Sequence, residues 1–133
     1  MNWKLILQLS LFGLAMGMAT VFYVGSRIEP FFWLVIFIFC AYTIARKCPK
    51  NHFWHGVLLG LANSVWITGA HILLFNQYLA SHEQEANMMR SLPLAPKAMM
   101  AITGPVVGVV SGVVMGILAV IVGKVLKRAP AGR

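Results

Sequence analysis

Residues 98–123, AMMAITGPVVGVVSGVVMGILAVIVG, carry no charge and place a glycine at every fourth position: Gly104, Gly108, Gly112 and Gly116. A helix of this sequence has a smooth groove along one face, and in lipid such a groove lets the backbone of another helix approach closely. The stretch therefore predicts a membrane-spanning helix and marks one packing face. It does not by itself indicate any chemistry.

The composition extends this prediction to the whole chain of 133 residues. Hydrophobic residues make up 59% and charged residues 11%, with a mean hydropathy of +0.79, whereas about a quarter of the residues in a soluble domain are charged. A spanning helix needs roughly 20 apolar residues, and four stretches qualify, at about 3–25, 28–45, 53–80 and 98–125. We expect an all-α integral membrane protein, with four transmembrane helices in an antiparallel bundle that forms a single domain, 1–133.

The positive charges are distributed unequally between the two sides of this arrangement. Eight fall on the side of the termini (Lys4, Arg46, Lys47, Lys50, Lys124, Lys127, Arg128, Arg133) and three on the other (Arg27, Arg90, Lys97). Because cytoplasmic loops carry the excess of Lys and Arg, both termini are predicted to be cytoplasmic. The net charge of +8 is thus explained by topology, and no nucleic-acid partner is expected.

The first span is expected to stay in the membrane, and the two cysteines are expected to stay reduced. The apolar run from Leu5 to Val24 is longer than the apolar region of a signal peptide, so we expect it to remain as a helix. Cys40 is placed in the second span and Cys48 in a cytoplasmic loop, and no disulfide is expected.

The connections set which helices are neighbours. The turn around Ser26 to Pro30 is short, as is the one that contains Pro49, so the first three helices are expected to pack side by side. Pro105 leaves two alternatives for the last span: either the proline kinks a longer helix, or the helix begins there. Residues 83–90 are expected to extend the third span or to lie at the interface.

Small residues also recur by fours in two other spans, at Gly13 and Gly17 and at Gly56 and Gly60. Both pairs are predicted to be helix-packing positions, like the four glycines of the last span. The second span has no glycine and is rich in Phe and Trp. It either fills the grooves of its neighbours or faces lipid.

The third span is the polar one, and it holds a candidate membrane site formed by Asn63, Ser64, Trp66, Thr68 and His71. At about 100° per residue, Asn63 and Trp66 share one face, and the other three share an adjacent face. Both faces are expected to point into protein. For Asn63 and Trp66 we favour hydrogen bonds to another helix, or for Asn63 to a bound water, over a cavity lining. His71 is a functional hypothesis because it is ionisable within a span, and the structural alternative is a neutral imidazole hydrogen-bonded to a carbonyl.

The sequence gives little evidence for a catalytic site, a metal site or a cofactor site. His52 and His55 have the spacing of two helical metal ligands, with Cys48 nearby, but no third ligand follows by spacing. No carboxylate lies within a span, and Glu29 is placed in a tight loop, so neither an enzyme nor a proton-coupled exporter is expected. Soft ligands for Cu(I) are present at Met88, Met89, Met99, Met100 and His82. Methionines beside a membrane are more often adaptable apolar contacts, and we favour that role here.

One resemblance follows from the second half of the chain. It combines Phe53-Trp54-His55-Gly56, then Asn63-Ser64-Val65-Trp66, a Glu-containing loop, and Gly104-Pro105 with repeated glycines and a basic end. This pattern resembles small uncharacterised four-helix membrane proteins of bacteria. The resemblance implies four spans in a bacterial inner membrane and carries no activity or site.

Different features of the sequence favour two different functions. Three grooved helices favour a protein that acts through helix association, as an accessory or self-assembling unit in the bilayer, with a second copy or another membrane protein as its partner. The polar third span favours the alternative, an oligomeric channel or small transporter. No cofactor is expected for either.

Overall fold

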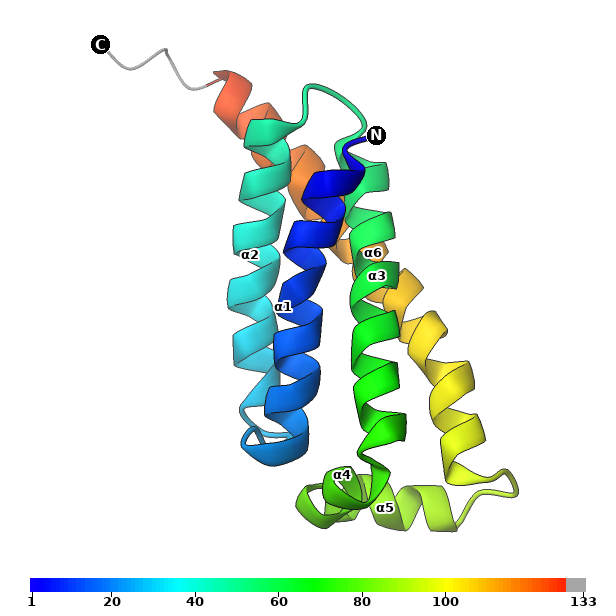
Figure 1. The fold of residues 1–133 in the computed structure, drawn as a ribbon. Coiled ribbons are helices and arrows are strands. Elements are labelled where there is room, and N and C mark those ends of the chain that lie inside the picture. The colour runs from blue at the N-terminus through cyan, green and yellow to red at the C-terminus, as the bar shows by residue number, and fades with distance from the viewer. Residues whose placement is uncertain (129–133) are drawn as a thin grey trace.

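The structure, a computed structural model, describes residues 1–128 and shows an all-α protein. Four helices are long and apolar enough to cross a membrane: α1 (Trp3–Phe22), α2 (Glu29–Lys47), α3 (His52–Leu73) and α6 (Pro96–Arg128). Two short helices, α4 (Phe75–Ser81) and α5 (Glu83–Arg90), lie across one end of the long helices (Figure 1). The chain is therefore a small multi-pass membrane protein whose apolar spans contact the lipid bilayer.

Both ends of the described chain lie at the same end of the bundle. The N-terminus, the loop between α2 and α3, and the last turns of α6 are together at the top of Figure 1, with α4 and α5 at the opposite end. This agrees with an even number of spans. Arg133, one of the basic residues in the topology count, lies outside the described residues.

The helices do not pack in the order expected from the short connections. Helix α3 is central, with α1 against one side and α6 against the other, while α2 packs mainly on α6 and touches α1 and α3 only slightly. The prediction that the first three helices are close neighbours is wrong in this respect. A short turn joins two helices at one end only, and side-chain fit decides the rest: α2 buries Cys40, Ala41 and Ile44 in a cluster with Met115 and Ala119 of α6.

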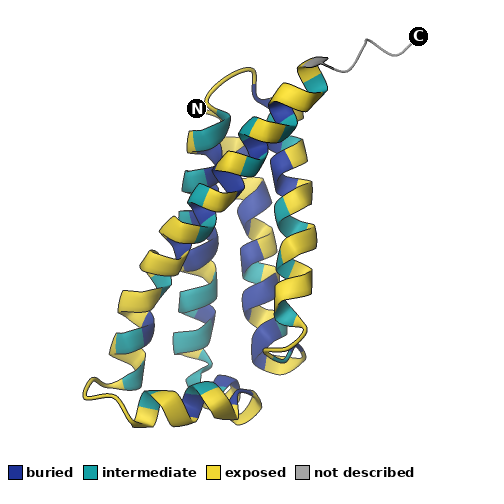
Figure 2. Cartoon of the chain, turned by 180° about the vertical axis from the view of Figure 1, so that it is seen from behind, coloured by how far each residue is buried: buried dark blue, intermediate teal, exposed yellow. Residues whose placement is uncertain are grey.

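The remainder of α2 faces outward, and Figure 2 shows exposed and intermediate residues along most of this helix. Its aromatic and branched residues stay exposed, with Phe31 at 70% and Val35 at 67%. In a bilayer these side chains meet lipid, which was one of the two alternatives for this span.

Helices α3 and α6 approach each other closely where glycines face glycines. A methyl group built on Gly60 would overlap Cα of Gly112 and would lie 2.6 Å from the carbonyl oxygen of Gly108. One built on Gly56 would overlap the backbone of Gly116. These contacts lie within one chain.

Two helix boundaries differ from the sequence prediction. Helix α6 runs unbroken from Pro96 through Pro105, so this proline lies inside the helix and does not begin it. The third span, expected to reach residue 80, ends at Leu73, and α4 and α5 are separate helices. The physical reason is that two exposed amides, Asn76 and Gln77, follow within the next turn. Their amides would be costly in hydrocarbon, so the chain turns away from the bundle axis before it reaches them.

Candidate functional site

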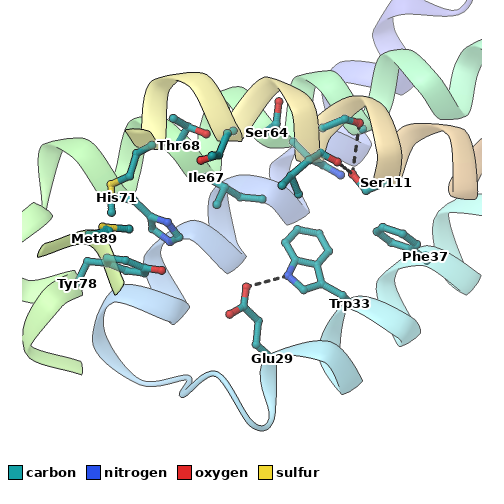
Figure 3. A pocket seen from close by; sticks show the side chains of 17 residues that line it. Glu29, Trp33, Phe37, Ser64, Ile67, Thr68, His71, Tyr78, Met89 and Ser111 are labelled. Carbon is teal, nitrogen blue, oxygen red and sulfur yellow. Dashed lines mark hydrogen bonds between the residues drawn. The ribbon is translucent and has the colours of Figure 1, made fainter. Parts of the chain in front are cut away.

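A cavity of about 370 Å³ lies between α2, α3 and α6 in the half of the bundle away from the termini (Figure 3). The opposite half is filled by the apolar cluster around Leu59, Ile44 and Met115. The cavity is lined by Glu29, Trp33 and Phe37 of α2; Gly60, Asn63, Ser64, Ile67, Thr68 and His71 of α3; Tyr78 and Met89; and Met100, Thr103, Gly104, Val107, Gly108 and Ser111 of α6.

Four of the five polar candidates on α3 are brought together at this cavity, namely Asn63, Ser64, Thr68 and His71. Trp66 is not part of it: its indole nitrogen donates a hydrogen bond to Ser10 Oγ of α1 at 3.1 Å. Helix α1 therefore packs against the face of α3 that carries Trp66. The interhelical hydrogen bond expected for Trp66 is present.

Asn63 behaves differently from that expectation. Its side chain is 3% exposed, and neither Oδ1 nor Nδ2 has a hydrogen-bond partner within residues 1–128. The expected hydrogen bond between Asn63 and another helix is therefore not formed. The reason lies in its neighbour on α1, because Gly13 packs against Asn63 and offers only backbone there. A buried amide without a partner is uncommon in folded proteins and calls for a physical explanation.

Three hydroxyl groups at the cavity already use their protons within their own helices. Ser64 Oγ donates to the Leu61 carbonyl at 2.8 Å, Thr103 Oγ1 to the Met99 carbonyl at 2.8 Å, and Ser111 Oγ to the Val107 carbonyl at 2.7 Å. A hydroxyl has one proton and two lone pairs. These three groups therefore meet a ligand as acceptors.

His71 is held at the same end of the cavity by α1. Thr20 Oγ1 lies 2.8 Å from Nε2 of His71, 2.9 Å from the Met16 carbonyl and 3.1 Å from the Gly17 carbonyl. When its single proton goes to a carbonyl, Nε2 of the neutral ring donates to Thr20 and Nδ1 is left as an acceptor. The imidazole of His71 therefore has a hydroxyl as its partner, where the structural alternative would have been a carbonyl.

Tyr78 stacks on His71 with ring centroids 4.1 Å apart, and His82 stacks on the other face of Tyr78 at 4.3 Å. Burial raises the pKa of the Tyr78 phenol to about 12, and the negative charges of Glu85 and Glu29 add to the shift. The phenol is therefore neutral at physiological pH. Hydrogen bonds from Ser26 Oγ to Glu85 at 2.6 Å and from Ser81 Oγ to the Val21 carbonyl at 3.1 Å attach α4 and α5 to the end of α1.

Glu29 is the site residue that sequence reasoning missed. It was placed in a tight loop, but it is the first residue of α2, and its Oε1 accepts a hydrogen bond from the indole nitrogen of Trp33 at 3.1 Å. Pro30 suits the first turn of a helix, so the helix begins early enough to put Glu29 and Trp33 one turn apart. The Glu-x-x-x-Trp spacing directly before an apolar run was the available signal.

The histidines at the end of the bundle near the termini form hydrogen bonds with backbone groups. His55 Nδ1 donates to the Asn51 carbonyl at 2.8 Å, and its Nε2 accepts from the amide of Asn2 at 3.0 Å, at the start of α1. His52 Nε2 lies 2.7 Å from the Cys48 carbonyl. Within residues 1–128, no three His, Cys, Asp or Glu side chains are grouped so that they could hold a metal ion.

No known protein family, curated protein or solved structure matches this chain. Its function is therefore argued from the site itself.

Proposed function

We propose that this chain is a non-enzymatic membrane protein that binds a small amphipathic molecule in the cavity between α2, α3 and α6, as a small transporter or carrier does. The observation that carries the proposal is a mainly apolar cavity of about 370 Å³ whose wall brings together a few polar side chains, among them Glu29, Thr68 and His71. Sites for small molecules are typically apolar, measure roughly 300–1,000 Å³, and contain a few convergent polar groups.

The shape of the interior favours a binding site over an open pore. The cavity occupies one half of the bundle, and the cluster of Leu59, Ile44 and Met115 closes the other half. A solute that entered from the α4–α5 end would stop at the level of Gly60 and Ser111. Passage across the membrane would require this cluster to rearrange, as in a carrier with alternating access.

The association hypothesis loses its main motivation. It was motivated by three grooved helices and by the lack of catalytic groups, and of the two contacts open to these grooves, within the chain or between subunits, Gly108, Gly112 and Gly116 make the first, with α3. We propose that these glycines, with Gly56 and Gly60, serve the internal packing of the protein. A homo-oligomer would then have to form through other faces.

We further propose a bacterial inner membrane with both termini in the cytoplasm, on the eight-to-three distribution of Lys and Arg. The cavity, with Glu29 and Tyr78, would then lie in the outer half of the bilayer.

Two matched tryptophan variants of α6 test the proposal. Val107 lines the cavity and is 62% exposed, whereas Val110 does not line it and is 61% exposed. Val107→Trp is expected to fill the cavity and Val110→Trp to add the same ring outside it. Calorimetric titration of the protein in nanodiscs, corrected with empty nanodiscs, would use three probes with one apolar body: phenylbutylamine, phenylbutanol and phenylbutyrate.

The expected result is saturable binding of at least one probe to the wild type and to Val110→Trp, with at least tenfold weaker binding to Val107→Trp. Equal binding to both variants, or no saturable binding of any probe, would overturn the proposal.

A further inference from the structure

We infer that the ligand of this cavity is a small organic ammonium, that is, a protonated amine on an apolar body. The inference rests on the proposed binding function and adds the chemistry of the ligand. Three independent features of the lining support it: its charge, the direction of its hydrogen bonds, and the placement of its aromatic rings.

The charge of the lining is negative. Among the cavity-lining residues of the described chain, 1–128, Glu29 carries the one carboxylate, and neither Lys nor Arg is present. Glu29 is half-buried beside apolar groups, where an unpaired charge is costly. A cationic ligand would offset this cost, whereas an anionic one would add to it.

The hydrogen-bonding groups of the lining are mostly acceptors. Ser64, Thr103 and Ser111 have already donated their protons to their own helices. Trp33 has donated its indole proton to Glu29. The hydroxyls of Thr68 and Tyr78 can still donate, but a ligand that supplies donors finds acceptors at Glu29 and at the three hydroxyls above. A primary ammonium has three donors, in contrast to an ether, a carboxylate or a quaternary ammonium, which have none.

The aromatic rings stand at the same end as the carboxylate. Figure 3 shows Glu29 and Trp33 on one side of the cavity, with His71 and Tyr78 beside them at one end and Phe37 at the other. A cation near Glu29 would lie beside Trp33, whose ring attracts it through its quadrupole. The apolar body would extend toward Phe37. The two ends of the cavity thus match the two parts of an amphipathic amine.

Charge-neutralising variants and the three probes test this inference. Glu29→Gln removes the charge but keeps an oxygen that can accept the hydrogen bond from Trp33. Glu83→Gln makes the same change at an exposed residue that does not line the cavity. The measurement is calorimetric titration in nanodiscs, with thermal unfolding of each variant as the check on folding.

The expected result is that phenylbutylamine binds the wild type at least tenfold more tightly than phenylbutanol, and that phenylbutyrate binds more weakly still. Glu29→Gln is expected to remove this preference for the amine, while Glu83→Gln keeps it. Equal binding of amine and alcohol, or an unchanged preference in Glu29→Gln, would overturn the inference.

The same data separate the two proposals. If the alcohol or the carboxylate binds as well as the amine and Val107→Trp blocks it, the cavity is a binding site but its ligand is not an ammonium. If no probe binds, or Val107→Trp binds as well as Val110→Trp, both proposals fail together.

Discussion

Helix α3 offers a direct test of how tightly the bundle is packed, because two of its glycines have opposite surroundings. A methyl group at Gly60 would overlap Cα of Gly112 and would lie 2.6 Å from the carbonyl oxygen of Gly108. A methyl group at Gly69 would meet nothing within 4 Å. Gly60→Ala and Gly69→Ala are therefore the same chemical change on the same helix, once at the crossing with α6 and once in open space.

The expected change in the free energy of unfolding has two contributions. Alanine is favoured over glycine in a helix by about 1 kcal/mol, and this gain applies to both variants. At Gly60 the obstructing atoms belong to the backbone of α6, which cannot turn aside as a side chain can, so the helices must separate. We take the upper end of the cost of overpacking, about 3 kcal/mol. Gly60→Ala should then be destabilised by about 2 kcal/mol and Gly69→Ala stabilised by about 1 kcal/mol.

The difference of about 3 kcal/mol corresponds to roughly a hundredfold change in the folding equilibrium constant. It can be measured by unfolding both variants in mixed micelles with increasing SDS and by following helix content by circular dichroism. Equal stability of the two variants would refute the close crossing of α3 and α6. A loss of stability in both would show that the effect is not steric.

Three further predictions follow from single residues. Asn63→Leu replaces an unpartnered buried amide by an isosteric apolar group, so SDS unfolding should show unchanged or higher stability; a loss of more than about 1 kcal/mol would mean that the amide has a partner. For topology, native Cys48 is a poor reporter because it is 3% exposed and burial raises the pKa of its thiol. In a Cys48→Ser background, Lys50→Cys should resist an impermeant maleimide in intact cells and Ser91→Cys should react; the reverse pattern would invert the orientation. Tyr78 should form its phenolate near pH 12, measured as the difference in ultraviolet absorbance between the wild type and Tyr78→Phe. Because its pKa is higher in the folded state than the ordinary value of 10, its contribution to stability is complete below pH 10 and is lost as the pH rises toward 12; a phenolate formed near pH 10 would contradict its burial.

The four spans could be predicted from the sequence because length and hydropathy are local properties. A run such as 98–123 is apolar whatever packs against it. The spacing of Gly104, Gly108, Gly112 and Gly116 is equally local, and it predicts that these four residues share one helix face. The end of α3 at Leu73 was harder to predict, because the apolar pattern continues through Phe75 and only the amides that follow interrupt it.

The partners of the helices could not be predicted, because they depend on three-dimensional fit. Helix α2 follows α1 in the sequence but packs on α6, where Cys40 and Ala41 are small enough to let it approach. Trp66 and Asn63 share a helical face that packs against α1, yet only Trp66 forms a hydrogen bond there. The role of Glu29 depended on a helix that begins one residue before a proline.

The cavity itself can be traced to a gradient of side-chain size along α3. Its residues facing α6 are Gly56, Gly60, Ser64 and Thr68, and their counterparts on α6 are Gly116, Gly112, Gly108 and Gly104.

The α6 side of this interface is glycine throughout, so the size of the α3 residue sets how closely the helices approach. The side chain grows from a hydrogen atom to the hydroxymethyl of Ser64 and the branched Thr68, in the direction away from the termini. Figure 1 shows α6 crossing α3 obliquely and lying apart from it toward the α4–α5 end. At the other end α6 leans toward α2, where Met115 and Ala119 fill the space with Cys40 and Ala41. The oblique crossing therefore closes one half of the bundle and opens the other. The same small-to-large series that sets the crossing also places the hydroxyls of Ser64 and Thr68 on the wall of the opened half.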